Sequence, residues 1–418
     1  MGMERRNRGS RVALSEDELV RAPGPLRGTR VLDLVDGPGV YGPKVMVSLG
    51  AEVIRVEPPG GSPQRDYAPL YRPDQAAAVG ASLYFLHYNT GKKGITLDCS
   101  TSEGRKLLHR LLDQTDIVFD NGQLDHLGLA PEELAERSGL VVVSVTPFGL
   151  RSARSQWQGG DLVCQAMSGM ISLYGYRDER PARFGPEQAS EMSGLAAAFG
   201  ALIAFYGSRR TGKGEFVDIA MERVGCMVSL QMSNASMYHQ FGFRHLREDR
   251  PDGLPAILTQ ASDGFVQLRW WQEVDATLAL IEDQGLAGDL RSARARLDPA
   301  QFARHEPFRN AVLQFAASKT RAELMEIAPA YAIHGLPVHD IEDLVRDPFL
   351  TGRAFFAEVE LPEGAGPFLD IGSAVRFGKT PWRVARRPPL LAEHNEQVYG
   401  ALGVDSAELE RLSSAGVI

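Results

Sequence analysis

Short apolar runs alternate with longer amphipathic stretches along the first part of the chain. The runs with the pattern of buried strands are residues 29–36, 51–59, 92–99, 116–121 and 139–149. After the third run, Leu107, Leu108, Leu111 and Leu112 fall on one face of a predicted helix that Thr101 or Ser102 can cap. Strands that alternate with helices in this way predict a doubly wound α/β sheet.

The pattern changes beyond residue 223. "GFVQLRWW" predicts a short strand, "RAELMEIAPAYAI" an amphipathic helix, and the chain becomes proline-rich and extended from residue 335. We therefore expect a flexible N-terminal arm (1–24), a large Rossmann-like domain built from both chain ends (25–223 and 335–418) and a smaller mixed α/β domain (224–334).

Composition narrows the functional classes. The 418-residue chain carries a net charge of −8, which argues against general binding to nucleic acid. Since no apolar segment reaches the roughly 18 residues of a membrane span and no secretory signal is present, we expect no membrane partner and a cytoplasmic location. The cysteines at 99, 164 and 226 are widely spaced, as expected for free thiols in a reducing compartment.

Motifs for several common cofactors are missing. There is no HExxH, no close His/Cys cluster and no Walker motif, so the sequence predicts no metal site. The turn after the first strand, residues 36–43, resembles GxGxxG only loosely, because Pro38 and Pro43 lack the amide hydrogens that bind a pyrophosphate. A tight structural turn is favoured there, and a nicotinamide-dependent oxidoreductase is disfavoured.

Several longer segments together resemble one family. They are "VLDLVDGPGVYGPKVMVSLGAEVIRVEPPGGSPQR", "NTGKKGITLDCSTSEGRKLLHRLLDQTDIVFDN", "LGLAPEELAERSGLVVVSVTPFG", "GGDLVCQAMSGMISLYG", "RRTGKGEFVDIAM", "HGLPVHDIEDLVRDP" and "RRPPLLAEHNEQV". In this order they resemble the family III CoA-transferases, also called the CaiB/BaiF family. The resemblance extends over residues 28–400 and is weakest at 230–330.

The resemblance implies a fold and a chemistry. It implies a Rossmann-like large domain, a small domain and two ring-shaped protomers interlocked as a homodimer. It further implies an acyl-CoA or other acyl thioester as substrate, with no tightly bound cofactor. In the family's transferases an aspartate attacks the thioester carbonyl, which suits a carboxylate because it is ionised at pH 7 and leaves readily from an anhydride.

This chain departs from that pattern at the nucleophile. Counting back from Gly194 in "SEMSGLAAAFG" places Ser190 at the aspartate position. A serine hydroxyl needs an adjacent base. The neighbouring Glu191 is a carboxylate, but one step along a helix rotates a side chain by about 100°. Asp161 is a second candidate base. The structural alternatives are that Ser190 and Asp161 cap helices and that Glu191 is only favoured in a first helical turn by the helix dipole.

The resemblance also suggests CoA contacts. Asn121 is the strongest, because a strand-end position needs a polar group facing the ligand. Arg55 is a candidate partner for the nucleotide phosphates, with a plain strand residue as the alternative. The remaining candidates are Lys92, Arg65, Gly39, Leu97, His126 and Thr146. His126 replaces a family arginine, Thr146 replaces a lysine, and Gly160 stands where the family's racemases have a histidine base.

Four hypotheses follow. The chain is a CoA-transferase that uses Glu191 or Ser190, or a relative that isomerises, cyclises, dehydrates or hydrolyses an acyl thioester. The third is a non-catalytic ligand-binding relative, and the fourth an unrelated oxidoreductase. The sequence does not separate the first two. Nor does it separate CoA from a carrier-protein phosphopantetheine.

Overall fold

The protein is described from a computed structural model that covers residues 24–71, 82–228, 231–244, 247, 258–361, 366–373, 375–382 and 386–418. Residues 1–23 of the predicted N-terminal arm lie outside these residues. The chain divides into two compact units, one of residues 1–174, 182–245 and 353–418 and one of residues 175–181 and 246–352. These bounds differ from the predicted ones at both ends: residues 224–245, predicted in the small domain, belong to the larger unit, and residues 335–352, predicted in the large domain, belong to the smaller unit.

The large unit contains a six-stranded parallel sheet in the order β3-β2-β1-β4-β5-β6. The strands are β1 (Arg30–Asp33), β2 (Glu52–Glu57), β3 (Lys93–Thr96), β4 (Ile117–Asp120), β5 (Val141–Thr146) and β6 (Glu215–Ala220). This order confirms the doubly wound α/β prediction. It also places the point where strand order reverses between β1 and β4, which is where open α/β sheets bind ligands.

Alternate residues of the strands supply two separate cores. Leu32 of β1 and Val142 of β5 face one core, whereas Val31 and Val143 face the other. This period of two follows from the pleat, and strands buried on both faces read as continuous apolar runs. Buried strand runs were therefore predictable, although each observed strand is shorter than its apolar run.

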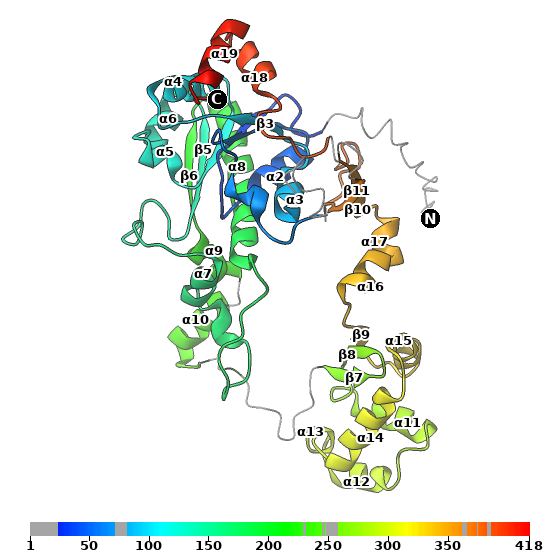
Figure 1. The fold of residues 1–418 in the computed structure, drawn as a ribbon. Coiled ribbons are helices and arrows are strands. Elements are labelled where there is room, and N and C mark those ends of the chain that lie inside the picture. Colours follow the sequence, from blue (N-terminus) through cyan, green and yellow to red (C-terminus); the bar gives the residue numbers. More distant parts are fainter. Residues whose placement is uncertain are drawn as a thin grey trace, which may run out of the picture. The chain divides into compact units, whose positions relative to one another are not determined.

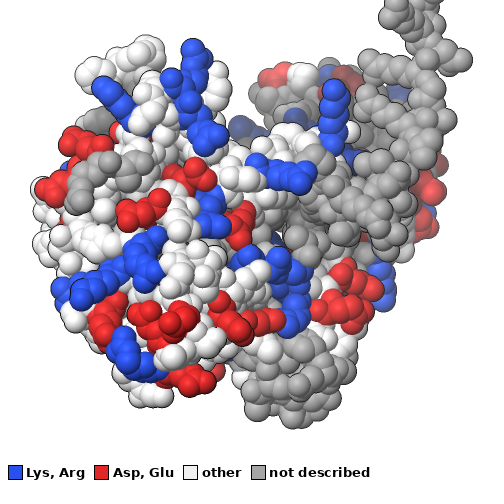
Figure 2. Space-filling view, turned by 90° about the horizontal axis from the view of Figure 1, so that it is seen from above, with Lys and Arg blue, Asp and Glu red and all other residues white. Residues whose placement is uncertain are grey.

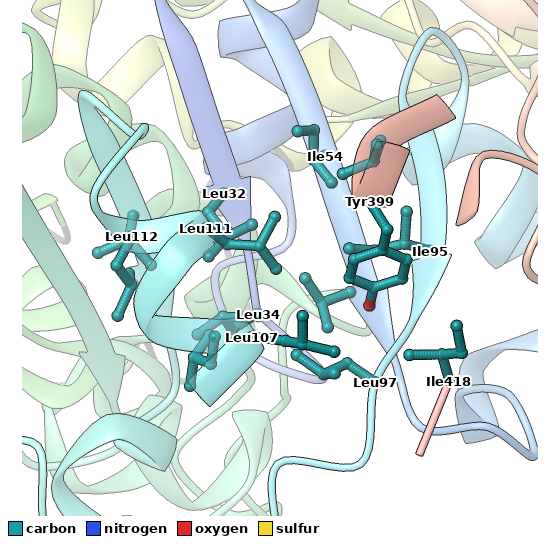
Figure 3. Close-up of a cluster of buried hydrophobic side chains, with 14 of the residues drawn as sticks. Leu32, Leu34, Ile54, Ile95, Leu97, Leu107, Leu111, Leu112, Tyr399 and Ile418 are labelled. Carbon is teal, nitrogen blue, oxygen red and sulfur yellow. The ribbon is translucent and has the colours of Figure 1, made fainter. Parts of the chain in front are cut away.

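One face is covered by helices from both chain ends. They are α4 (Ser102–Leu112), α6 (Pro131–Ser138), α18 (Asn395–Ala401) and α19 (Ser406–Ser414). Thr101 caps α4, since its hydroxyl accepts from the Gly104 amide at 3.0 Å. The C-terminal segment packs on this face: the Tyr399 hydroxyl donates to the Thr96 carbonyl at 2.6 Å, and Tyr399 and Ile418 join the leucines of α4 (Figure 3).

The other face is covered by α2 (Tyr41–Ser48) and α8 (Gln188–Thr211) (Figure 1). Two glycines bring these helices into backbone contact. A Cβ added to Gly194 would lie 2.8 Å from the Tyr41 Cβ and 3.0 Å from the Gly42 amide nitrogen, and one added to Gly42 would lie 3.2 Å from the Gly194 carbonyl oxygen. This contact places the start of α8 beside the loop between β1 and α2.

Helix α8 is, among the described residues, the one helix whose length and composition would allow it to cross a membrane. Of its most apolar window, 44% is buried against the rest of the protein, with Ala197, Ala198 and Ala201 in the sheet core. Its outward face carries Leu195, Phe199, Ile203 and Tyr206, each more than half exposed.

The large unit also contains further helices and one antiparallel hairpin. They are η1 (Pro63–Asp66), α3 (Leu83–Asn89), α5 (Gln123–His126), α7 (Asp161–Met167), η3 (Met170–Leu173), α9 (Met221–Val228), α10 (Gln231–Phe241) and the antiparallel hairpin β10 (Phe356–Glu360) with β11 (Pro367–Ile371).

The second unit has a small sheet and a helical core of its own. The antiparallel strands β7 (Thr259–Ala261), β8 (Gly264–Leu268) and β9 (Gly335–Pro337) form the sheet. The helices are α11 (Val274–Asp283), α12 (Leu290–Arg296), α13 (Pro299–Ala303), α14 (Glu306–Ala317), α15 (Arg321–Ala330), α16 (Ile341–Arg346) and α17 (Pro348–Gly352). Trp270, Phe302, Phe308 and Phe315 fill the core between them.

The α2–α8 contact predicts the effect of two alanine substitutions in one helix. Gly194→Ala pushes a methyl group into the backbone of α2 and should destabilise the protein by about 1–3 kcal/mol. Gly207→Ala is the matched control: its Cβ would meet no atom within 4 Å, so alanine should stabilise α8 by about 0.5–1 kcal/mol. Urea unfolding measures both. Equal effects of the two substitutions would contradict the close approach.

Candidate active site

The site is built at the carboxyl ends of β1 and β4. Asn121, directly after β4, holds the first loop in place: its side-chain oxygen accepts from the Asp36 amide at 2.8 Å, and its side-chain nitrogen donates to the Pro38 carbonyl at 2.6 Å. The same nitrogen donates to the Val145 carbonyl at 2.8 Å. Asn121 therefore links three strand ends, and its amide group is fully used within the protein.

A buried ion network lies beneath this loop. Lys92 donates to Asp33 at 2.7 Å and to Asn89 at 3.1 Å, and Arg55 lies 3.6 Å from Asp33 and 3.2 Å from Asp36. The side chains of Arg55, Lys92 and Asp33 are at most 2% exposed. Burial lowers the pKa of Lys92 to about 8, even though Asp33 favours its charged form. These cations are committed to internal carboxylates, and the predicted phosphate contacts of Arg55 and Lys92 remain predictions.

The other predicted CoA contacts are scattered over the same end of the sheet. Arg65 forms two 2.7 Å hydrogen bonds with Glu57 and stacks on the ring of Phe85. Thr146 accepts from the Gly149 amide at 3.0 Å, Leu97 is buried in the core, and His126 is exposed on α5.

Gly39 has a defined structural task. Its φ of 91° lies in the left-handed region, and a Cβ there would come within 3.0 Å of three Val145 side-chain atoms. Only glycine fits so close to β5 with this backbone conformation. The tight turn expected for residues 36–43 is thus explained by packing. The Gly39 amide then points at α8, where it donates to the Ser190 hydroxyl at 3.3 Å.

Ser190 is not a helix cap. Helix α8 begins at Gln188 after the N-cap residue Glu187, so Ser190 lies inside the first turn and the predicted cap is wrong. Its hydroxyl accepts from Gly39 and hydrogen-bonds to the Glu187 carboxylate, and the residue is 2% exposed. The reason for the error is that Glu187 adopts a φ of 63°, which starts the helix three residues earlier.

Asp161 supports Ser190 instead of capping its own helix. Gly160 is the N-cap residue of α7, and the Asp161 carboxylate accepts from the Ser190 amide at 3.0 Å and from the Gln165 side chain at 2.6 Å. Burial and the nearby Asp161 charge raise the pKa of Glu187. Two carboxylates thus lie at the start of α8, and one of them, Glu187, was not predicted.

Glu191 faces a different environment from Ser190. It is half-buried, and its carboxylate accepts a hydrogen bond from the Tyr88 hydroxyl of α3. Burial raises the pKa of Glu191 to about 7. The rings of Tyr88 and Tyr84 lie 4.5 Å apart, and the Glu191 charge contributes to raising the pKa values of both Tyr84 and Tyr41.

The sequence argument did not identify these tyrosines. Tyr84 and Tyr88 are four residues apart on α3, a spacing that puts two aromatic rings on one helix face. That signal was present in "LYFLHYN", but nothing in the sequence indicated which helix this face would meet.

Asp370 links α2 and α3 to the C-terminal hairpin. It comes from β11, and its buried carboxylate accepts from Lys44 at 2.7 Å and contacts the His87 ring nitrogen at 2.6 Å. The hydrogen bond with His87 and the charge of Lys44 lower the pKa of Asp370 despite its burial. The C-terminal hairpin thereby anchors the helix that carries Tyr88.

No group of three His, Cys, Asp or Glu side chains in the described part of the chain is placed to hold a metal ion. The three cysteines are free, and burial raises the pKa of Cys164 to about 12, which leaves its thiol protonated.

On the face of the protein shown in Figure 2, basic and acidic side chains are interspersed. The chemistry available at the start of α8 is therefore that of carboxylates, hydroxyls and backbone amides.

The comparisons with known proteins identify the family. Residues 26–395 match the family model described as CoA-transferase family III. The chain belongs to CoA-transferase family III, so the resemblance noted in the sequence is confirmed. A crystal structure of a CaiB/BaiF family protein from Brucella suis superposes with a TM-score of 0.78 at 26% identity, covering 91% of this chain and all of that one.

Two curated relatives are similar over nearly their whole length. The succinyl-CoA:(R)-benzylsuccinate CoA-transferase subunit BbsE of Thauera aromatica is 30% identical over 93% of this chain and 97% of its own. The succinyl-CoA:mesaconate CoA-transferase of Haloarcula marismortui is 28% identical over 92% and 98%. The chain is thus an enzyme of a family that uses CoA thioesters as substrates.

The raised pKa of Glu191 predicts a pH-dependent stability. In the unfolded chain this carboxyl ionises near pH 4.5, whereas in the folded protein it holds its proton up to about pH 7. The folded state therefore binds more protons between these values, and its stability falls as pH rises through that window. Glu191→Gln should remove the loss of stability that this carboxyl causes between pH 4.5 and 7. Tyr88→Phe should extend that loss to higher pH, because the Glu191 carboxylate loses a hydrogen-bond donor and its pKa rises further.

Urea unfolding of the three proteins between pH 4 and 8.5 measures this effect. Glu187→Gln should remove only the part of the pH dependence that the raised pKa of Glu187 causes, since the substitution leaves the Tyr88–Glu191 bond in place. An identical pH dependence for wild type and Glu191→Gln would contradict the assignment.

Proposed function

We propose that this chain moves CoA between carboxylic acids and that the Glu191 carboxylate performs the covalent step. The observation that carries the proposal is the position of Glu191. It is a half-buried carboxyl with a pKa near 7, held by the Tyr88 hydroxyl and one residue from the position that the resemblance assigns to the nucleophile. A carboxylate of raised pKa is a stronger nucleophile than an ordinary surface carboxylate, yet it is still ionised in a large fraction of molecules at neutral pH.

The proposed reaction is an exchange through anhydrides. The Glu191 oxygen bonds to the thioester carbonyl carbon and the carbon–sulfur bond breaks, which releases CoA as a thiolate. The thiolate then attacks the Glu191 carbonyl of the anhydride, so that the first acid leaves as a carboxylate and CoA remains on Glu191. A second carboxylic acid reverses these two steps. The Tyr88 hydroxyl is positioned to donate to the Glu191 oxygen as its charge changes.

Ser190 has a supporting part in this proposal. Its buried hydroxyl is occupied by the Gly39 amide and Glu187, which ties the first loop to the start of α8. Of the predicted catalytic residues, Asp161 in turn holds the Ser190 backbone. Asn121 holds the same loop from the β4 side, and CoA contacts at this loop stay part of the proposal.

Trapping the covalent intermediate tests the role of Glu191. Wild-type protein incubated with an acyl-CoA and then with hydroxylamine or borohydride should carry the modification on residue 191, located by peptide mass spectrometry. Glu191→Gln should lose both the adduct and at least about 10³-fold of the exchange rate, because an amide is not a competent nucleophile. Ser190→Ala should retain the adduct. Loss of the adduct in Ser190→Ala with retention in Glu191→Gln would reverse the assignment.

A second candidate function is that of a subunit without its own nucleophile. It is favoured by the serine at position 190, which replaces the family's aspartate and is 2% exposed, and by the Thauera relative, whose name describes a subunit. Under this alternative the wild type alone gives no adduct, and exchange requires an aspartate-bearing family III chain. Ser190→Asp should then create an adduct at residue 190. Under the first proposal the wild type already forms the adduct on residue 191, and Ser190→Asp is not required for it.

We also propose that two chains associate through α8. The exposed apolar row Leu195, Phe199, Ile203 and Tyr206 supports this, because such a contiguous row on one helix face is typical of an interaction surface. Phe199→Glu combined with Ile203→Glu should convert a dimer to a monomer in light scattering. The control Arg209→Glu changes charge on the same helix at a residue that lies against Phe205, outside the apolar row. A dimer that persists in the double variant would contradict the proposal.

A further inference from the structure

A row of three tyrosine rings leads from the protein surface to Glu191. Tyr67 follows η1 and is 45% exposed, Tyr84 is half-buried, and Tyr88 is 8% exposed. The ring centroids of Tyr67 and Tyr84 lie 5.5 Å apart, and those of Tyr84 and Tyr88 lie 4.5 Å apart, with interplanar angles near 60°. The last ring carries the hydroxyl that binds the Glu191 carboxylate. We call Tyr67, Tyr84 and Tyr88 the tyrosine row.

Two exposed leucines neighbour the tyrosine row along the chain. Leu70 and Leu83 are 39% and 37% exposed, and a backbone bond from the Leu83 amide to the Pro69 carbonyl holds their two segments together. Exposed apolar side chains beside aromatic rings are typical of a site that binds the apolar part of a substrate.

The basic side chains around the tyrosine row are already neutralised. On α2 and α3, Lys44 and His87 both contact the Asp370 carboxylate. On β2, Arg55 contacts Asp33, and on η1, Arg65 contacts Glu57. Among these elements none is left to pair with a second carboxylate on a substrate. An aromatic ring needs no such partner, since its edge packs on the face of another ring at 4.5–7 Å.

We infer that the tyrosine row is an acyl-group subsite, and that one of the two acids exchanged on CoA carries an aryl ring that packs on it. This inference rests on the proposed role of Glu191, because it places the carboxyl end of that acid at Glu191 and its ring on Tyr84 and Tyr67. It adds a class of substrate, an arylalkanoyl-CoA, and three residues that select it.

Binding of stable thioether analogues tests the subsite without turnover. The probes are 3-phenylpropyl-CoA, butyl-CoA and 4-carboxybutyl-CoA, each titrated into the full-length protein by calorimetry. Wild type should bind the phenyl probe about tenfold more tightly than the other two, which is the effect of one aromatic pair beyond its buried area.

Variants then locate the preference. Tyr67→Ala should reduce the preference for 3-phenylpropyl-CoA over butyl-CoA several-fold, whereas Tyr67→Phe should keep this preference because the ring remains. Phe265→Ala is the matched control, since this ring on β8 is 47% exposed and belongs to the other unit. Equal binding of the phenyl and butyl probes, tighter binding of the carboxylate probe, or an unchanged preference in Tyr67→Ala would overturn the inference.

Glu191→Gln separates this inference from the proposed function. It should keep the phenyl preference while it loses the covalent adduct. A wild type that shows the preference but forms no adduct would refute the role of Glu191 and leave the tyrosine row as an aryl-binding site. A wild type that forms the adduct without the preference would refute the subsite alone.

Discussion

The contact between Gly42 and Gly194 is the constraint on which the site depends. It lets the backbones of α2 and α8 touch, and no side chain separates them. Ser190 lies one helical turn before Gly194, and Gly39 lies one turn before Gly42. Contact at one pair therefore brings the other pair within hydrogen-bond distance. The same close contact between α2 and α8 places Glu191 against Tyr88 of α3, so one helix contact positions both Ser190 and Glu191.

The polar groups around this contact form two sets with different tasks. The ion network of Asp33, Arg55 and Lys92, together with Asn121, holds the first loop on the sheet, and its members are satisfied by one another. Glu187 and Glu191 at the start of α8 have raised pKa values because burial opposes their charge. Buried groups that are paired stabilise a fold, whereas partly buried carboxyls with perturbed pKa values are typical of catalytic sites.

The C-terminal part of the chain supports the site from two directions. Tyr399 completes the core on one face of the sheet, far along the sequence from the strands that it covers. Asp370 joins α2 to α3 on the side of the candidate nucleophile. A large unit built from both chain ends thus explains why residues near 370 and near 90 contribute to one environment.

The sequence alone determined the strands, the parallel α/β class and the family, because buried runs of period two and several ordered motifs are local signals. It also showed that position 190 lacks a carboxylate. It misplaced the N-caps of α7 and α8, which are Gly160 and Glu187, and Glu187 adopts a left-handed conformation that is uncommon for a residue other than glycine. The tertiary structure decided that Ser190 faces Gly39, that Glu191 meets Tyr88 and that Glu187 lies beside Ser190. The first two contacts join segments about 100 or more residues apart, and the third depends on how the start of α8 is buried. A local sequence pattern predicts neither long-range contacts nor burial by distant segments.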